Sequence, residues 1–339
     1  MALHEFIGDD KVVRLAHGAL ADNLSEAETV ARVTKVNAST IGETVKYVIP
    51  MPLPYRVYGW RNNRAEPIVF DKYSEAAFQV STAKHIYSGT EIIQEDLADE
   101  TRAARVVGAQ TLAVARGVNQ GVVDAITGAD YSVTIGAGIE EGGLRRAIRE
   151  AAYALDKLGA PQRGRYLLVS PSFELAMGDD PRLVTQNWSG DANTSQAFAE
   201  NVIARVGGFL VVRSATVPDG EAYAYSGEGF VFGAATPPPL QTKHSAVLDE
   251  NDLALRWSYD ASLAFMQNQS VVDVWTGFQA VELPLLIQDT AANTSLVTEE
   301  TYFRHGVKLV LGGESVWPAA NSDLAKVGVT APVTGTVTP

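Results

Sequence analysis

The chain contains no cysteine, and its acids outnumber its bases. Because none of the 339 residues is Cys, disulfide bonds, thiolate nucleophiles and cysteine-ligated zinc are excluded. There are 40 Asp and Glu against 27 Lys and Arg, a formal net charge of −13. Such a surface binds nucleic acid poorly and opposes close self-association. Any assembly therefore has to rely on apolar burial and local charge pairing.

Long apolar runs are also missing. No stretch approaches the ~18 apolar residues that a membrane-spanning helix needs. Met1–Phe6 lacks the basic start and apolar run of a secretory signal. We therefore expect no membrane partner. The content of 46% hydrophobic and 20% charged residues is typical of an ordered globular protein, and the length allows two domains.

Patterns that indicate catalysis or metal binding are absent as well. The five histidines include no pair at H-x-x-x-H spacing, which argues against a helical metal site. The glycines of Gly136–Gly143 do not follow G-x-G-x-x-G, and Glu140 would face the phosphates. Ser170 does not lie in a G-x-S-x-G motif. We predict no catalytic residue, no metal and no cofactor, although residues distant in the sequence can still meet in space.

The first feature that is present is an extended arm. Pro50, Pro52 and Pro54 remove backbone donors at alternate positions, which an exposed arm tolerates and a central strand does not. Strands are predicted on either side, at Thr44–Ile49 and Phe78–Thr82. Residues 41–86 are therefore predicted to form a long open hairpin. The alternative is a surface loop packed on its own domain.

A long helical stretch follows, over about residues 91–127. The part from Asp99 to Thr127 would span roughly 43 Å if continuous, and a break near Asp96–Asp99 is an alternative. Small residues, among them Gly108 and Gly117, are expected to let neighbouring elements approach this helix closely. Long arms and lone helices do not bury their own apolar surface. This order of elements therefore indicates a shell or lattice protein rather than an enzyme folded around a pocket.

An α/β domain and two late strands complete the pattern. The late strands, 253–259 and 271–281, suit an antiparallel pair. Residues 1–40 are predicted to be a mobile or partner-bound arm. It would be polar and irregular apart from a short helix near 24–28, with Ser25 as the cap. The chain from 319 is predicted to be a loose tail. The middle of the chain predicts helices over 144–155, from Pro171 and over 195–206, strands over 165–170 and 209–213, and a hairpin of 223–225 with 230–232. In the first of these helices the apolar residues recur at helical spacing and predict its buried face: Leu144, Ala147, Ile148, Ala151, Ala152 and Leu155.

Several short segments occur in an informative order. They are Phe78–Ile86 followed by Ser88–Leu97, Tyr166–Glu174, Gly207–Val212 leading to Val217–Gly220, and Leu255–Asp260 followed by Val274–Phe278. In this order they resemble segments of tailed-bacteriophage major capsid (coat) proteins. The segments are similar to the entry into the spine helix, to two parts of the axial domain, and to the late peripheral strands. The resemblance covers about residues 41–283.

The resemblance implies an α+β phage major capsid protein fold. Its parts are an N-terminal arm, an extended β-hairpin loop, a peripheral domain with a long spine helix, and an α/β axial domain. About 55 residues follow the last matched strand, and an added strand or an inter-subunit clamp is expected there. The implied ranges are 1–40 (N-terminal arm), 41–86 (loop and flanking strands), 87–133 plus 245–318 (peripheral), 134–244 (axial) and 319–339 (C-terminal tail).

The resemblance also implies the partners. Copies are expected to form hexamers and pentamers that close into an icosahedral shell around packaged double-stranded DNA, without sequence-specific binding. The chain would then belong to the virion capsid, assembled in the host cytoplasm. No long coiled-coil segment precedes the arm, so a separate scaffolding protein is expected, with a portal and a decoration protein as further candidates.

The charge pattern predicts how copies meet. Pro50–Tyr73 carries four bases and two acids, whereas Glu91–Glu100 carries five acids and no base. We predict that the arm of one subunit docks near this acidic patch of a neighbour, with aromatic residues supplying most of the affinity. The alternative is that the acids merely suit a helix start. The predicted contact residues are Tyr55, Arg56, Tyr58, Trp60, Arg61, Arg64, Glu91, Glu95, Asp96, Asp99 and Glu100.

Two other functions stay as alternatives. One is an encapsulin-like cellular compartment shell of the same fold, which encloses enzyme cargo instead of DNA. The other is a soluble enzyme whose site is built from dispersed residues. Particle mass separates the enzyme from the two shells, and particle contents separate the shells from each other.

Overall fold

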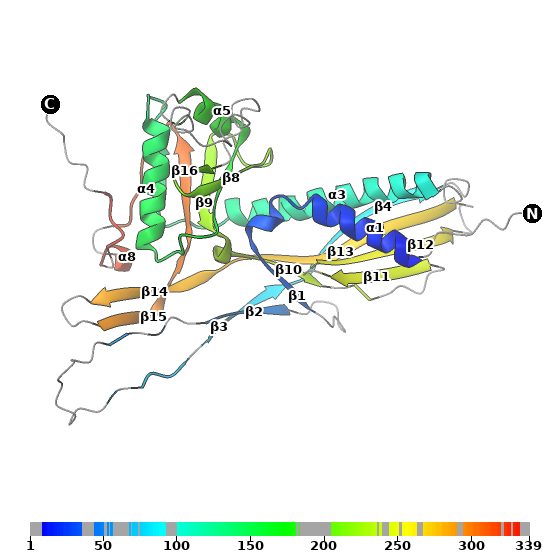
Figure 1. The fold of residues 1–339 in the computed structure, drawn as a ribbon, viewed down its shortest axis with the longest axis horizontal. Coiled ribbons are helices and arrows are strands. Elements are labelled where there is room, and N and C mark those ends of the chain that lie inside the picture. Colours follow the sequence, from blue (N-terminus) through cyan, green and yellow to red (C-terminus); the bar gives the residue numbers. More distant parts are fainter. Residues whose placement is uncertain are drawn as a thin grey trace, which may run out of the picture. The chain divides into compact units, whose positions relative to one another are not determined.

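The chain divides into two compact units (Figure 1). The first comprises residues 1–47, 78–126 and 230–279, and the second 48–77, 127–229 and 280–339. The computed structural model describes residues 9–35, 44–50, 53, 55–56, 68, 70–73, 75–92, 100–180, 183, 205–235, 237–238, 244–250, 253–262, 267–289, 294–319, 322–326 and 328–332.

The first unit is built on a six-stranded sheet. The path is β1 (Ala31–Lys35), β10 (Phe230–Ala235), β13 (Gln267–Ala280), β12 (Leu253–Ser262) and β11 (His244–Glu250), and β4 (Lys84–Ile92) also pairs with β13. β1 runs parallel to β10, whereas β4, β11, β12 and β13 form antiparallel ladders. The predicted antiparallel pairing of the two late strands is thus confirmed by β12 and β13.

The N-terminal segment forms a packed helix, where the sequence predicted an irregular arm. Helix α1 (Asp9–Asp22) packs on β11 and β12, and its buried residues recur at helical spacing: Val12, Val13, Ala16 and Leu20. The interpretation of residues 1–40 as a polar, irregular arm is therefore wrong for this stretch. The helix predicted near 24–28 is a single 3₁₀ turn, η1 (Ala27–Thr29), and Ser25 does not cap it.

Helix α3 (Glu100–Thr127) begins later than predicted. Its 28 residues span about 42 Å. Glu91 and Ile92 belong to β4, because the ladder with β13 continues to the pair Ile92–Asn268. Residues 93–99, where a break was considered, lie outside the described residues.

Glycines allow α3 to approach the strands of its own unit. A methyl group added at Gly117 would lie 2.8 Å from Ile86, and one at Gly121 would lie 2.3 Å from the Phe278 ring. The close approach predicted for small residues therefore occurs at Gly117. At Gly108 no described atom lies within 4 Å of such a methyl, so no described neighbour requires a glycine at that position.

The second unit has its own six-stranded sheet. Its order is β5 (Thr134–Ala137), β16 (Gly306–Leu311), β9 (Glu221–Ser226), β6 (Arg165–Val169), β8 (Phe209–Arg213) and β7 (Arg205–Val206). The predicted strands at 165–170 and 209–213 are confirmed. The predicted hairpin of 223–225 with 230–232 is wrong. After the turn η2 (Gly227–Gly229), the chain leaves this sheet, and β10 pairs with β1 in the first unit's sheet.

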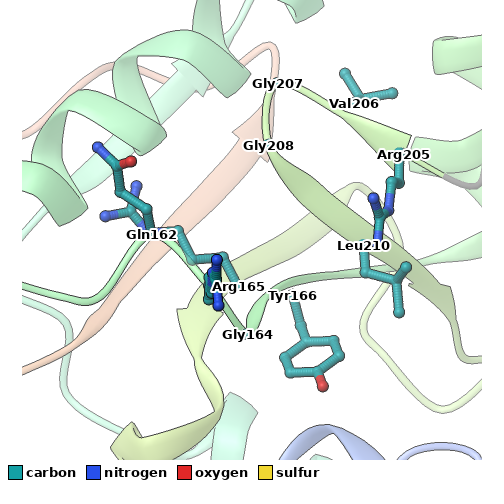
Figure 2. Close-up of a pocket in the computed structure, with 10 residues that line it drawn as sticks. Gln162, Gly164, Arg165, Tyr166, Arg205, Val206, Gly207, Gly208 and Leu210 are labelled. Atoms are coloured by element: carbon teal, nitrogen blue, oxygen red, sulfur yellow. The ribbon is translucent and has the colours of Figure 1, made fainter.

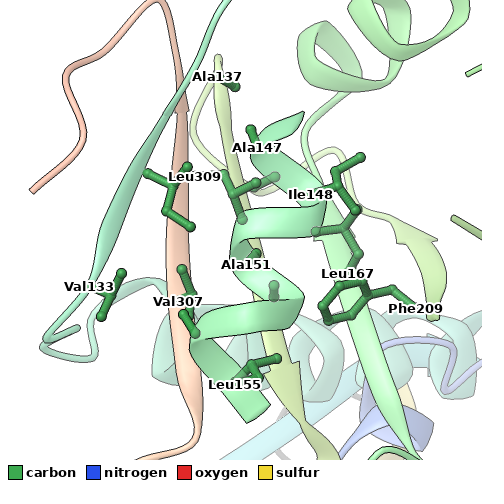
Figure 3. Close-up of a cluster of buried hydrophobic side chains, with 14 of the residues drawn as sticks. Val133, Ala137, Ala147, Ile148, Ala151, Leu155, Leu167, Phe209, Val307 and Leu309 are labelled. Atoms are coloured by element: carbon green, nitrogen blue, oxygen red, sulfur yellow. The ribbon is translucent and has the colours of Figure 1, made fainter. Parts of the chain in front are cut away.

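One face of this sheet is covered by α4 (Gly143–Lys157). Figure 3 shows Ala147, Ile148, Ala151 and Leu155 of α4 against side chains of β6, β8 and β16. The helical spacing of these residues predicted this face. Helix α5 (Pro171–Asp179) begins as predicted after Ser170, whose Oγ accepts a hydrogen bond from the Phe173 amide at 3.3 Å.

The C-terminal part of the chain changes the predicted domain boundaries. The sequence predicted that residues 245–318 belong to the same domain as the long helix. β16 instead pairs with β5 and β9 in the sheet of the second unit. β14 (Glu282–Asp289) and β15 (Thr294–Arg304) form a separate two-stranded sheet. The segment from 319 is not simply a loose tail, because α8 (Asp323–Lys326) and its surroundings bury Leu324 and Val329 in the second unit's core.

His305, between β15 and β16, gives the second unit an acid-sensitive point. Only 6% of this residue is exposed, and no partner for its Nδ1 occurs among the described residues. Burial, aided by the Arg165 charge and opposed by a backbone hydrogen bond at Leu158, lowers the pKa of His305 to about 4. The folded protein therefore keeps this ring neutral where an unfolded chain would protonate it.

We expect acid to destabilise the protein through His305. Below pH 6.5 the unfolded chain binds this proton and the folded chain does not, so stability falls from pH 6.5 to about 4, by about 3 kcal/mol. Chemical denaturation of the unassembled subunit across this range measures the slope. His305→Gln should make the stability depend less steeply on pH. The remaining pH dependence would come from carboxylates such as Glu221. Burial raises the pKa of Glu221, but hydrogen bonds from Lys308 and Tyr223 lower it by more. An unchanged slope would contradict this assignment.

Candidate assembly surfaces

The arm, residues 44–81, exposes much apolar surface. β2 (Thr44–Pro50) and β3 (Glu75–Ser81) pair in a two-stranded sheet, which confirms both predicted strands. Phe70, between them, is 88% exposed. Six of the 12 large apolar side chains exposed on the described chain belong to this arm: Val48, Leu53, Tyr55, Ile68, Phe70 and Tyr73. Apolar groups gathered in this way are typical of a surface that another molecule covers.

The structure describes few of the predicted contact residues of the arm. Tyr55 is 45% exposed. The Arg56 guanidinium lies 2.9 Å from the carboxylate of Asp71, so this base already has an acidic partner within the arm. The remaining arm residues of the prediction lie outside the described residues: Tyr58, Trp60, Arg61 and Arg64.

The predicted acidic patch is split between two elements. Glu91 is exposed on strand β4, opposite Gln269 of β13. Glu100 is the first residue of α3. The prediction that Glu91 lies on the long helix is therefore wrong. Glu95, Asp96 and Asp99, between these two elements, lie outside the described residues.

A buried ion cluster joins three strands of the first unit. Asp273 of β13 is 1% exposed and accepts two hydrogen bonds from Arg256 of β12, at 2.9 Å from Nε and 2.5 Å from Nη2. His85 Nε2 of β4 lies 2.7 Å from the same carboxylate. The cluster joins β13 to β12 and to β4, and it favours the observed register of these two ladders. Sequence reasoning missed it, although an arginine at an inward position of an alternating strand was a signal.

A neutral network attaches α3 to the same sheet. Gln110 donates a hydrogen bond to the Ser270 carbonyl at 2.8 Å, and the Ser270 hydroxyl donates to Gln110 Oε1 at 3.0 Å. Trp257 Nε1 donates to the same hydroxyl at 3.0 Å. Because buried polar groups are costly when unpaired, this network specifies how the helix lies on its sheet.

The second unit contains a hollow of about 560 Å³ at the start of β6 and β8. Figure 2 shows Gln162 and Arg165 on one side of it and Arg205 and Leu210 on the other. We call this feature the arginine hollow. Three of its ten lining residues are arginines and none is an acid: Gln162, Arg163, Gly164, Arg165, Tyr166, Arg205, Val206, Gly207, Gly208 and Leu210.

The described part of the chain offers neither a metal site nor a membrane-spanning helix. There, no three His, Asp or Glu side chains gather closely enough to hold a metal ion. No described helix is both long and apolar enough to span a membrane. The surfaces that call for an explanation are therefore the exposed arm and the arginine hollow.

Comparison with known proteins explains this architecture. The sequence model of the phage capsid protein family matches residues 80–277, more than half of the chain. That range holds α3, the ion cluster and the arginine hollow. No curated protein sequence matches the chain.

Solved capsid structures share the fold. The capsid of the cyanophage P-SCSP1u superposes with a TM-score of 0.51 at 13% identity, over 83% of this chain and 85% of that chain. The capsid of Ralstonia phage GP4 gives 0.50 at 11% identity, over 84% and 88%. The mixed helix-and-sheet architecture is therefore that of phage capsid proteins, as the sequence predicted. The chain belongs to the phage capsid protein family, and it is a structural subunit of a virion capsid that assembles with copies of itself.

Proposed function

We propose that this subunit forms hexamers and pentamers that close into an icosahedral shell around packaged double-stranded DNA. The observation that carries the proposal is the exposed arm, which leaves apolar side chains such as Phe70 uncovered in a single subunit. The net charge of −13 suits a container wall that holds DNA by closure and does not bind it tightly. In this function the chain performs no catalysis.

Each unit takes a part in the proposed shell. The first unit, with α3 as the spine helix, serves as the peripheral domain, and the second as the axial domain around which a capsomer forms. Support comes from the length of α3, about 42 Å, and from the separate core of each unit. Assembly takes place in the host cytoplasm with a separate scaffolding protein and a portal, and a decoration protein is a further candidate.

The arm docks near the acidic patch of a neighbouring subunit. The bases Arg61 and Arg64 face acids between Glu91 and Glu100 in this arrangement, while Tyr58 and Trp60 bury apolar area. Each exposed ion pair contributes only about 0.2–1 kcal/mol, so the charges mainly set orientation and register. Arg56 contributes less than the other bases because Asp71 already pairs with it.

Charge reversal tests the docking. Arg61→Glu with Arg64→Glu should shift subunits from shells to unassembled species in sedimentation velocity, because repulsion replaces attraction at the acidic patch. Arg61→Lys with Arg64→Lys keeps the charge and is the control. Shells that form from the reversed variant at the wild-type concentration would refute the docking. Reversing Asp96 and Asp99 to arginine in the same chain should then restore assembly.

A further inference from the structure

We propose that the arginine hollow is a second contact between copies, in which Arg163 and Arg205 bind a carboxylate-bearing segment of a neighbouring subunit. This inference goes beyond arm docking, because it concerns a different surface, wholly within the second unit. It rests on assembly of the chain with copies of itself and needs no particular shell geometry.

Arg165 forms a wall of the hollow and is not available to a ligand. It is 6% exposed, and its guanidinium donates to the carbonyl of Pro161 at 2.8 Å and to that of Ala160 at 2.7 Å. The same group pairs with the Asp156 carboxylate at 2.6 Å. These contacts hold the turn before β6, so Arg165 shapes the hollow and its charge is neutralised within the chain.

Arg163 and Arg205 differ from Arg165 in their exposure and in the contacts of their guanidinium groups. Both are exposed, and neither side chain makes a hydrogen bond or ion pair with another described residue. Among the described residues no acid lines the hollow, although acids exceed bases by 13 in the whole chain. Two guanidinium groups without a partner in the described part of an acidic protein make a local site for an anion, and carboxylates are the anions that every copy displays in excess.

The apolar residues of the hollow favour a protein segment over a nucleic acid. Leu210 is 39% exposed and lies directly opposite Arg205 in the β7–β8 ladder. A peptide that carries an acid beside an apolar side chain covers both Arg205 and Leu210. A phosphate backbone would pair with the arginine and leave Leu210 exposed to solvent. Among the described strands, β7 is also the terminal strand of its sheet.

Zero-length cross-linking tests the contact directly, because the cross-link forms only where an amine touches a carboxylate. Arg163→Lys with Arg205→Lys keeps the charge and supplies amines. Shells are assembled from equal amounts of isotopically light and heavy subunits and treated with a carbodiimide. We expect light–heavy cross-linked peptides that join position 163 or 205 to an Asp or Glu, located by mass spectrometry. Cross-links confined to single subunits, or none at these positions, would overturn the proposal.

A charge-reversed variant separates the remaining explanations. Arg163→Glu with Arg205→Glu should keep the thermal midpoint of the unassembled subunit, since both side chains are exposed, and raise the concentration needed for shells roughly tenfold. The variant with lysine at both positions should assemble at the wild-type concentration. If reversed subunits assemble normally but the particles lose DNA, the hollow binds phosphate and the proposal is wrong. Because the arm is untouched in these variants, a failure here leaves arm docking standing.

Discussion

Replacing Asp273 by asparagine is expected to destabilise the unassembled subunit by about 3–5 kcal/mol, because the substitution leaves the Arg256 charge buried without a counter-ion. Asp273 is 1% exposed and bonds to both Arg256 and His85. Asparagine keeps the volume of the side chain, so the loss reports the charge and not a cavity. Chemical denaturation followed by circular dichroism measures it.

The exposed pair between Arg56 and Asp71 is the matched control. Its side chains are 42% and 31% exposed, so Asp71→Asn should cost less than about 1 kcal/mol. Replacing both buried partners, as Arg256→Met with Asp273→Leu, should recover most of the stability, since no charge is then left unpaired. An Asp273→Asn subunit as stable as the Asp71→Asn subunit would show that the cluster does not hold the sheet.

Replacing Ile68 and Phe70 of the arm by serine should block assembly without weakening the subunit. Both residues are exposed, at 63% and 88%, so their removal costs the single subunit almost nothing. If a neighbour covers them, the loss is about 3 kcal/mol per contact, which raises the concentration needed for shells roughly a hundredfold. Sedimentation velocity over a concentration series measures this shift.

A leucine outside the arm provides the control for this experiment. Leu175 on α5 is 69% exposed, comparable to Ile68. Changing Leu175 to serine removes about as much exposed apolar area as changing Ile68 to serine. If the arm variant and Leu175→Ser shift assembly equally, the arm has no special role in contacts between copies. A drop in the thermal midpoint of the arm variant would show that the arm packs on its own subunit.

Sequence periodicity predicted the elements whose buried face is continuous. The face of α4 was predicted because its apolar residues recur every three to four positions. β12 and β13 were predicted because they are long and alternate. α1 carries the same helical spacing at Val12, Ala16 and Leu20, so the sequence also contains the signal for this helix.

Other elements depend on partners far away in the chain. β4 is mostly polar, and only its ladder with β13, about 180 residues later, makes it a strand. The apolar runs of β9 and β10 fit a hairpin equally well, but each strand is buried and finds partners elsewhere. No local pattern distinguishes these outcomes, because side-chain alternation is the same in both.

The candidate surfaces show the same division. The prolines at alternate positions indicated the arm from the sequence alone. His85 and Asp273 meet across 188 positions, and the hollow brings Arg163 together with Arg205 through the β6–β8 pairing. Such juxtapositions follow from topology, and the sequence gives no spacing rule for them.

Electron microscopy of the purified chain, combined with gel filtration, tests the central claim most directly. The claim is that a single subunit exposes apolar surface, and that other copies cover this surface in the shell. It predicts closed particles of megadalton mass, in which residues 44–81 of each subunit contact a neighbour. A stable monomer or dimer at high concentration, with the arm folded against its own subunit, would contradict it.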